Sequence, residues 1–207
     1  MGLLNLLVRD PLAFACIVIP LLYSVVIHEV SHGWVAYKMG DPTAKWTGRL
    51  SLNPIKHLDL FGTVMLFLIG FGWAKPVPVN FNNIPNKRKG LIFVSAAGIV
   101  SNILIAFLCL LFLRLFPPRS AGISTVIIFY LVQINITLAA LNLIPIPPLD
   151  GSKILMGVAS ARTRYLLSRI EPYGFVIILA LLYLGILNPL IGIMRWIIMR
   201  LIGILLS

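Results

Sequence analysis

Long apolar stretches separated by short basic connections constrain this chain more than any other feature of its sequence. Residues 11–38, 90–113 and 122–143 form three runs that are each long enough to cross the ~30 Å hydrocarbon layer of a bilayer as a helix. Hydrophobic residues occupy 59% of the 207 positions and charged residues only 11%, which is far from the composition of a soluble domain. The sequence therefore predicts an all-α polytopic membrane protein with three core transmembrane helices.

A further apolar region, 173–206, is divided by Asn188-Pro189, so one or two C-terminal helices are expected after the core. Its second piece, 190–206, carries two arginines and is compatible both with crossing the membrane and with lying at the interface. No composition shift or repeat marks a soluble domain. We therefore expect one membrane domain over 1–207, with a core of about 11–158 and C-terminal helices at about 171–206.

The connection between the first two spans predicts smaller elements. Trp46–Pro54 alternates apolar and polar residues, which favours an arm of a small β-hairpin. Leu58–Gly72 is apolar but too short to cross the bilayer, and we interpret it as a re-entrant or buried element. In Lys75–Asn80 two prolines oppose a helix, so this stretch is expected to be extended. Either this stretch or Trp46–Leu52 is expected to offer an edge onto which an unwound peptide can add as a strand.

The formal net charge of +11 comes from seventeen Lys and Arg residues that lie mostly in the connections between apolar runs. This distribution is typical of membrane orientation and argues against nucleic-acid binding. The connection between the second and third spans holds only Arg114 and Arg119, whereas the connections before and after that pair of spans are rich in basic residues. The positive-inside rule therefore places Met1 outside and both basic connections, with His32 and Asp150, on the cytoplasmic side.

His28, Glu29 and His32 lie near the cytoplasmic end of the first span. Residues four apart project from one helix face, so the two imidazoles can bind a single Zn²⁺ with Glu29 beside them. A catalytic zinc usually takes three protein ligands and one water, so a third ligand must come from elsewhere. Among the six acidic residues, only Asp150 follows a proline-broken membrane helix on the correct side, and we expect it to complete the site.

Peptide hydrolysis at this site would require a base, a donor to the oxyanion and residues that bind the substrate. Glu29 is placed to take a proton from a zinc-activated water. A developing oxyanion needs a hydrogen-bond donor, for which Asn142 at the helix break is our candidate and Asn102 the weaker alternative. Asp150 could instead cap the helix that follows it, and either asparagine could serve helix packing. Candidate substrate-binding residues are Asn102, His57, Lys75, Pro76 and Val77, although a packing or loop role is the simpler interpretation of His57.

The His28–His32 motif paired with Asn142–Gly151 resembles the site-2 protease family of intramembrane zinc proteases. The likeness extends over about residues 27–151. It departs from the family at Ile99, where a proline is usual, and the chain lacks the PDZ and CBS modules of larger members. Further similarity to compact prokaryotic members lies in Asn53-Pro54 with His57 and Asp59, in Phe71–Asn80, and in Ala96-Ala97-Gly98 with Asn102.

The resemblance implies one zinc per chain on His28, His32 and Asp150, with Glu29 as the base. It further implies a bacterial or archaeal cell membrane as the location and a transmembrane helix as the substrate, cut in regulated intramembrane proteolysis or in removal of remnant signal peptides. The lipid bilayer is an expected partner. A homo-oligomer and a regulatory membrane partner are left open as further partners. Two other functions use the same residues: a metal-binding membrane transporter or sensor, and an inactive protease-like membrane chaperone.

Overall fold

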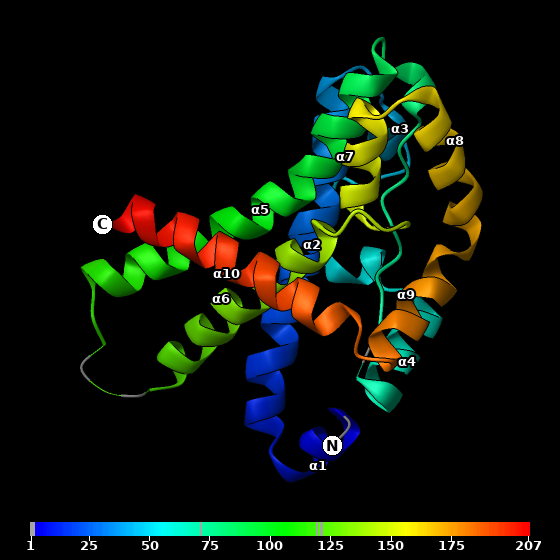
Figure 1. The fold of residues 1–207 in the computed structure, drawn as a ribbon. Helices are drawn as coiled ribbons and strands as arrows, with labels where there is room; N and C mark the ends of the chain where they lie inside the picture. Colours follow the sequence, from blue (N-terminus) through cyan, green and yellow to red (C-terminus); the bar gives the residue numbers. More distant parts are fainter. Residues whose placement is uncertain (1–2, 71, 119, 121) are drawn as a thin grey trace.

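The computed structural model describes residues 3–70, 72–118, 120 and 122–207 as helices joined by short connections (Figure 1). Within these residues, five helical segments are long and apolar enough to cross a membrane, which makes the chain an integral membrane protein and confirms the all-α prediction. They are Pro11–Lys38 (α2), Lys87–Leu115 (α5), Ile123–Asn142 (α6), Ala161–Tyr183 and Leu187–Leu206 (α10). The segment 161–183 comprises α8 (Ala161–Ile170), a 3₁₀ turn (η3, Glu171–Tyr173) and α9 (Gly174–Tyr183).

The shorter elements connect these spans. They are α1 (Leu3–Arg9), α3 (Thr43–Trp46), α4 (Leu60–Ile69), α7 (Asp150–Val158) and the 3₁₀ helices η1 (Pro54–His57) and η2 (Phe81–Asn83). In Figure 1, α7 lies beside α5 at the end of α2 that carries the histidine motif, while α8 and α9 lie on the other side of the extended segment 72–80. This extended segment therefore lies between the core helices and α9.

Local signals explain where α2 begins and ends. Pro11 occupies the first turn, where no amide donor is required, and the Asp10 carboxylate accepts a hydrogen bond from the Ala13 amide at 2.9 Å. After Lys38 the chain reaches Gly40, whose φ of +108° lies in the region that favours glycine. The helix therefore has the bounds that the sequence predicts.

The predicted β-hairpin at Trp46–Pro54 is wrong. In the described part of the chain no strand forms, and Leu58 and Ala74 make only an isolated antiparallel bridge. Trp46 ends the helix α3, Gly48 turns the chain with a φ of +65°, and the Asn53 side chain caps η1 by accepting from the Ile55 amide at 3.0 Å. Turn and capping residues thus interrupt the alternating pattern before a second strand arm can pair. In the segment 71–80, Phe71 lies outside the described residues.

Small residues bring the core helices together. Ala106 of α5 and Ala139 and Ala140 of α6 have no exposed surface, and side chains this small allow two membrane helices to pack closely. Ile198 and Ile202 of α10 cover this contact and are also buried. Large apolar side chains on the outer faces remain exposed, as expected for helices that face lipid.

The break between the two C-terminal helices differs slightly from the prediction. The chain turns at Gly185, with a φ of +71°, and not at Asn188-Pro189. Pro189 lies in the first turn of α10, where the missing amide donor costs nothing.

Candidate metal centre

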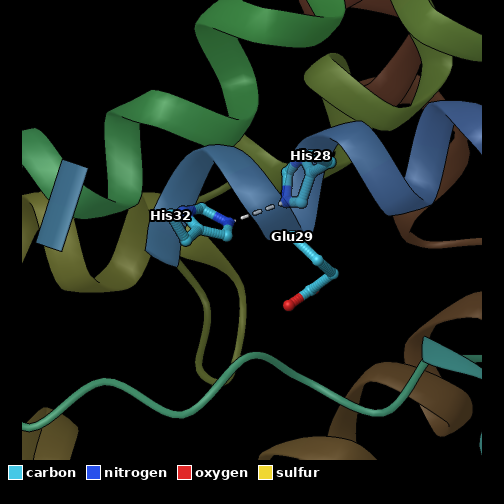
Figure 2. Close-up of side chains that lie close together, drawn as sticks. All are labelled: His28, Glu29 and His32. Carbon is cyan, nitrogen blue, oxygen red and sulfur yellow. Dashed lines mark hydrogen bonds between the residues drawn. The ribbon is translucent and has the colours of Figure 1, made fainter. Parts of the chain in front are cut away.

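The helix α2 presents His28 and His32 one turn apart on the face that meets α5 and α7 (Figure 2). Their Nε2 atoms lie 3.0 Å from each other. Asp150, the first residue of α7, brings its Oδ2 atom to 3.1 Å from Nε2 of His28 and 3.2 Å from Nε2 of His32. All three residues are buried. Three candidate ligand atoms from two helices therefore converge on one point.

The hydrogen bonds of the two Nδ1 atoms show that the lone pair of each imidazole lies on Nε2. Nδ1 of His28 lies 2.6 Å from Asn102 Oδ1, and Nδ1 of His32 lies 2.7 Å from the Val94 carbonyl oxygen. Both partners are acceptors, so each Nδ1 must donate, and a neutral ring then has a lone pair on Nε2. Asp150 Oδ2 is buried and accepts no hydrogen bond. Three electron-rich atoms this close repel one another unless a cation lies between them.

Zinc fits this donor set. Imidazole nitrogen and carboxylate oxygen are usual zinc ligands, and donors about 2.0–2.1 Å from a tetrahedral zinc are roughly 3.4 Å apart, close to the separations seen here. The hydrogen bonds from both Nδ1 atoms match the outer partners that orient zinc-binding histidines in general. The residues present therefore fit a zinc site made by His28, His32 and Asp150.

Gly98 allows α5 to approach this cluster. A Cβ atom at position 98 would lie 2.5 Å from His28 Cε1 and 2.6 Å from His32 Nε2, distances that real Cβ atoms do not show. Both imidazoles thus pack directly against the backbone of α5. The need for glycine here follows from the metal cluster as well as from helix packing.

Glu29 lies beside the cluster and points toward the extended segment (Figure 2). Its carboxylate can bring an oxygen within 4.8 Å of both histidine donor atoms, so it is an alternative third ligand by distance. However, Glu29 Oε2 accepts a hydrogen bond from the Val77 amide at 2.8 Å, whereas Asp150 Oδ2 is closer to both histidines and has no such partner. The geometry favours Asp150 as the ligand and leaves Glu29 next to the position of a reacting water.

A network of buried polar side chains fixes the orientation of the His28 ring. Asn102, which holds the His28 ring, donates from Nδ2 to Asn135 Oδ1 at 2.7 Å and to the Ser24 carbonyl at 3.3 Å. Asn135 in turn donates to the Ser24 hydroxyl and to the Leu131 carbonyl, both at 2.8 Å. Asn102, Asn135 and Ser24 come from α5, α6 and α2 and are at most 1% exposed. The orientation of one candidate ligand thus depends on three membrane helices.

A second polar cluster holds the extended segment in place. The buried Asp41 carboxylate accepts hydrogen bonds from the Thr43 amide and hydroxyl, the Asn83 side chain and the Asn80 amide, at 2.5–3.2 Å. Burial alone would raise the pKa of Asp41, but the hydrogen bonds from Thr43, Asn83 and Asn80 outweigh it and keep this pKa below its ordinary value. The segment 72–80 is therefore attached to α2 by Glu29 at Val77 and to the connection after α2 by Asp41 at Asn80.

Two cavities open from the cluster, and His28, Glu29, Asn142 and Pro148 line both. One has a volume of about 270 Å³ and extends toward α9, and the other has a volume of about 230 Å³ and extends toward α7. The Asn142 side chain donates one amide hydrogen to the Leu138 carbonyl at 3.0 Å, which leaves the second hydrogen for a ligand.

Only some of the residues that were predicted to bind substrate line the two cavities. Pro76 and Val77 line the second cavity, whereas Lys75 and Asn102 line neither. The Lys75 carbonyl accepts from Arg49, and its amide donates to the His57 carbonyl at 2.8 Å. His57 is buried, lines neither cavity, and donates from Nε2 to the Ser51 carbonyl at 2.7 Å. His57 thus links the connection at Ser51 to the extended segment at Lys75, and Asn102 orients the His28 ring.

Sequence reasoning missed Ser24 and Asn135. Each is a polar residue in an otherwise apolar span, and polar side chains in membrane helices usually face a partner. That signal was present in the sequence, although it does not identify the partner. The partner lies on another helix at each step of the network.

A hydrolytic zinc site needs three protein ligands, a position for water, and access for the substrate. The cluster and its two cavities offer these inside a bundle of membrane helices, which is the arrangement of a membrane-embedded zinc hydrolase.

Comparisons with known proteins agree with this class, and the chain belongs to peptidase family M50, the site-2 protease family. The profile of Peptidase family M50 matches residues 119–185. "Putative zinc metalloprotease YwhC" of Bacillus subtilis is 41% identical over 173 residues, which cover 80% of this chain and 78% of that protein.

More distant relatives carry similar descriptions. "Putative zinc metalloprotease Rip2" of Mycolicibacterium smegmatis is 30% identical over 182 residues, covering 84% of this chain and 69% of that protein. "Zinc metalloprotease MJ0392" of Methanocaldococcus jannaschii is 26% identical over 162 residues, covering 78% of this chain and 40% of that protein. No solved structure matches the chain.

Proposed function

We propose that this protein is an intramembrane zinc endopeptidase that hydrolyses a peptide bond within or near a transmembrane helix of a membrane-protein substrate. The observation that carries the proposal is the convergence of Asp150 Oδ2 with both histidine Nε2 atoms, in a buried site beside two cavities. In this proposal His28, His32 and Asp150 hold one zinc per chain. When bound, zinc lowers the pKa of a coordinated water to about 7 and polarises a substrate carbonyl.

The side chains of this chain carry out the proton transfers. Glu29 takes a proton from the attacking water as its oxygen bonds to the carbonyl carbon. The same carboxyl group then passes that proton to the amide nitrogen, and the C–N bond breaks to give a carboxylate and a free amine. The hydrogen bond from the Val77 amide to Oε2 orients Glu29 and leaves its other oxygen available for this exchange.

Asn142 is the proposed donor to the developing oxyanion. It lines both cavities at the end of α6, and its side chain keeps one amide hydrogen free of the helix. An intact substrate helix shields its peptide bonds, so the substrate must be unwound where it enters the site. Pro76 and Val77, which line the second cavity, are proposed to contact this extended part of the substrate.

We further propose that the site faces the cytoplasmic side of a bacterial or archaeal cell membrane. The support is the charge distribution, because the connections at the motif end of α2 and after α6 are the basic ones. The proposed substrate is a single transmembrane helix, from either regulated intramembrane proteolysis or a remnant signal peptide. Water would reach the site from that same side through the cavity that Lys153 lines.

The test is co-expression of the full chain with a candidate single-span membrane protein. Glu29→Gln should abolish cleavage and retain zinc, because the substitution removes the proton acceptor but no ligand. Asp150→Ala should lose both. Glu171→Gln is the matched control, since it makes the same change at an exposed position outside the cluster.

Zinc content measured on purified protein separates the two effects. Cleavage that persists in Glu29→Gln would contradict the assignment of the base, and full zinc occupancy in Asp150→Ala would contradict the ligand set. Metal transport that continues in Glu29→Gln without any proteolysis would favour the transporter function instead.

A further inference from the structure

The two cavities that meet at the cluster differ in chemistry. The cavity toward α9 is walled by apolar side chains from three helices and the extended segment, and it contains neither His32 nor Asp150. The cavity toward α7 contains His32, Asp150, Ser95 and Lys153, and it is the more polar of the two. Because Glu29 and His28 line both, the two cavities meet at the cluster.

The apolar cavity has the size of a side-chain pocket. Its volume of about 270 Å³ exceeds the ~150 Å³ of an apolar cavity that accommodates benzene. Trp73 and Phe175 both line it, with ring centroids 4.5 Å apart and an interplanar angle of 71°. Further apolar residues of its wall include Val25, Leu138, Leu141 and Ile178. An aromatic or large aliphatic side chain fits this volume and this lining.

The wall of the polar cavity includes a charged side chain, Lys153, that forms no ion pair within the described residues. Lys153 lines it one turn after Asp150, and among the described residues its ammonium group has no carboxylate within 4 Å. An ammonium group in a cavity wall favours an acidic or hydrogen-bonding side chain and disfavours a basic one. The Asp150 carboxylate does not pair with the Lys153 ammonium group, since it faces the two histidines.

We infer that the site selects substrates with a large apolar residue on one side of the cleaved bond, held between α6 and α9, and an acidic or polar residue on the other side, held at Lys153. This inference rests on the proposed function and specifies its substrate class. Such a sequence occurs where the apolar part of a membrane helix gives way to its polar flank. The preferred cleavage position would therefore be the end of the substrate helix and not its middle.

The test begins by mapping the cut in one cleaved substrate by mass spectrometry, with the full chain in lipid nanodiscs. The residue on the apolar side is then varied among Phe, Leu and Ala, and that on the polar side among Glu, Gln and Lys. We expect kcat/KM to fall at least about tenfold from Phe to Ala, and to fall from Glu to Lys. Leu138→Trp, which fills the cavity, should reverse the first preference, and Lys153→Glu should reverse the second.

Matched controls make the same changes outside the cavities. Val126→Trp adds the same side chain to an exposed position of α6, and Arg162→Glu makes the same charge change at an exposed position of α8. Both should keep the wild-type preferences. Preferences that are unchanged in Leu138→Trp and Lys153→Glu would overturn the inference while leaving the proposed function intact. Absence of cleavage by the wild type would count against the proposed function itself.

A binding measurement covers the case in which these variants do not fold. A substrate peptide carrying a photoreactive phenylalanine on the apolar side is crosslinked to the Glu29→Gln protein. Labelling of α6 or α9 is expected. Labelling of lipid alone would show that this substrate residue stays outside the cavity and would overturn the inference.

Discussion

Replacing Asn102 by alanine tests whether a buried amide determines how tightly the cluster binds zinc. The Asn102 side chain accepts from Nδ1 of His28 at 2.6 Å and donates to Asn135 at 2.7 Å and to the Ser24 carbonyl at 3.3 Å, so its removal leaves three buried polar atoms without these partners. Each such atom costs about 1–3 kcal/mol of folding stability. Without Asn102 the His28 ring can rotate or change tautomer, and the lone pair on Nε2 is no longer directed at the metal.

The expected loss of zinc affinity is about 10- to 100-fold, the usual effect of removing an outer partner of a metal ligand. This range corresponds to about 1.4–2.7 kcal/mol of binding free energy. Asn135→Ala acts one hydrogen bond further away and should weaken zinc binding less, and Ser24→Ala should have the smallest effect. The order of these three effects is a sharper prediction than any single value.

The assay is competition for zinc between the purified full chain and a chromophoric chelator, with the melting temperature recorded separately. Asn82→Ala, an exposed asparagine outside the network, serves as the control. Wild-type zinc affinity in Asn102→Ala would refute the reasoning. A larger loss in Asn135→Ala than in Asn102→Ala would also refute it, because the effect would not pass through His28.

Two other predictions concern positions next to the site. Gly98→Ala should abolish or strongly weaken zinc binding, because the added Cβ would lie 2.5–2.6 Å from atoms of both imidazoles; chelator competition that gives the wild-type affinity would contradict this. The carboxylate of Asp41 stabilises the folded state above the pKa of the unfolded chain, and since its folded pKa is lowered, this stabilisation is lost as pH falls through that value. The melting temperature of the detergent-solubilised wild type should therefore fall between about pH 5 and pH 3 more steeply than that of Asp41→Asn, which is less stable at neutral pH; parallel curves would argue against this role.

The sequence was sufficient to predict the elements whose signals are local. The first span starts at Pro11 and ends before Gly40 because these residues act on the backbone at their own positions. The meeting of Asp150 with the histidines was also predictable, because the two spans between them return the chain to the side on which the first span ends. That argument uses only the length and order of the spans.

Interactions between distant side chains and backbone were not predictable in this way. The hairpin at Trp46–Pro54 was expected because alternation of apolar and polar residues is a strand signal. In the structure, however, the extended segment that could have paired with it forms its backbone hydrogen bonds with side chains. Glu29 accepts from the Val77 amide, Asp41 accepts from the Asn80 amide, and Arg49 donates to the Lys75 carbonyl. No periodic pattern reports such pairs, since each partner comes from a separate part of the chain.

The contact between Glu29 and Val77 restricts how the extended segment can move. Pro76 and Pro78 have no amide hydrogen, so Val77 is the only residue of the three that can donate to the carboxylate. A slip of the segment by one residue in either direction would bring a proline nitrogen opposite Glu29 and lose the bond. The two prolines thus exclude a one-residue shift of the segment along α2, and this fixes the part of the wall that the segment contributes to both cavities.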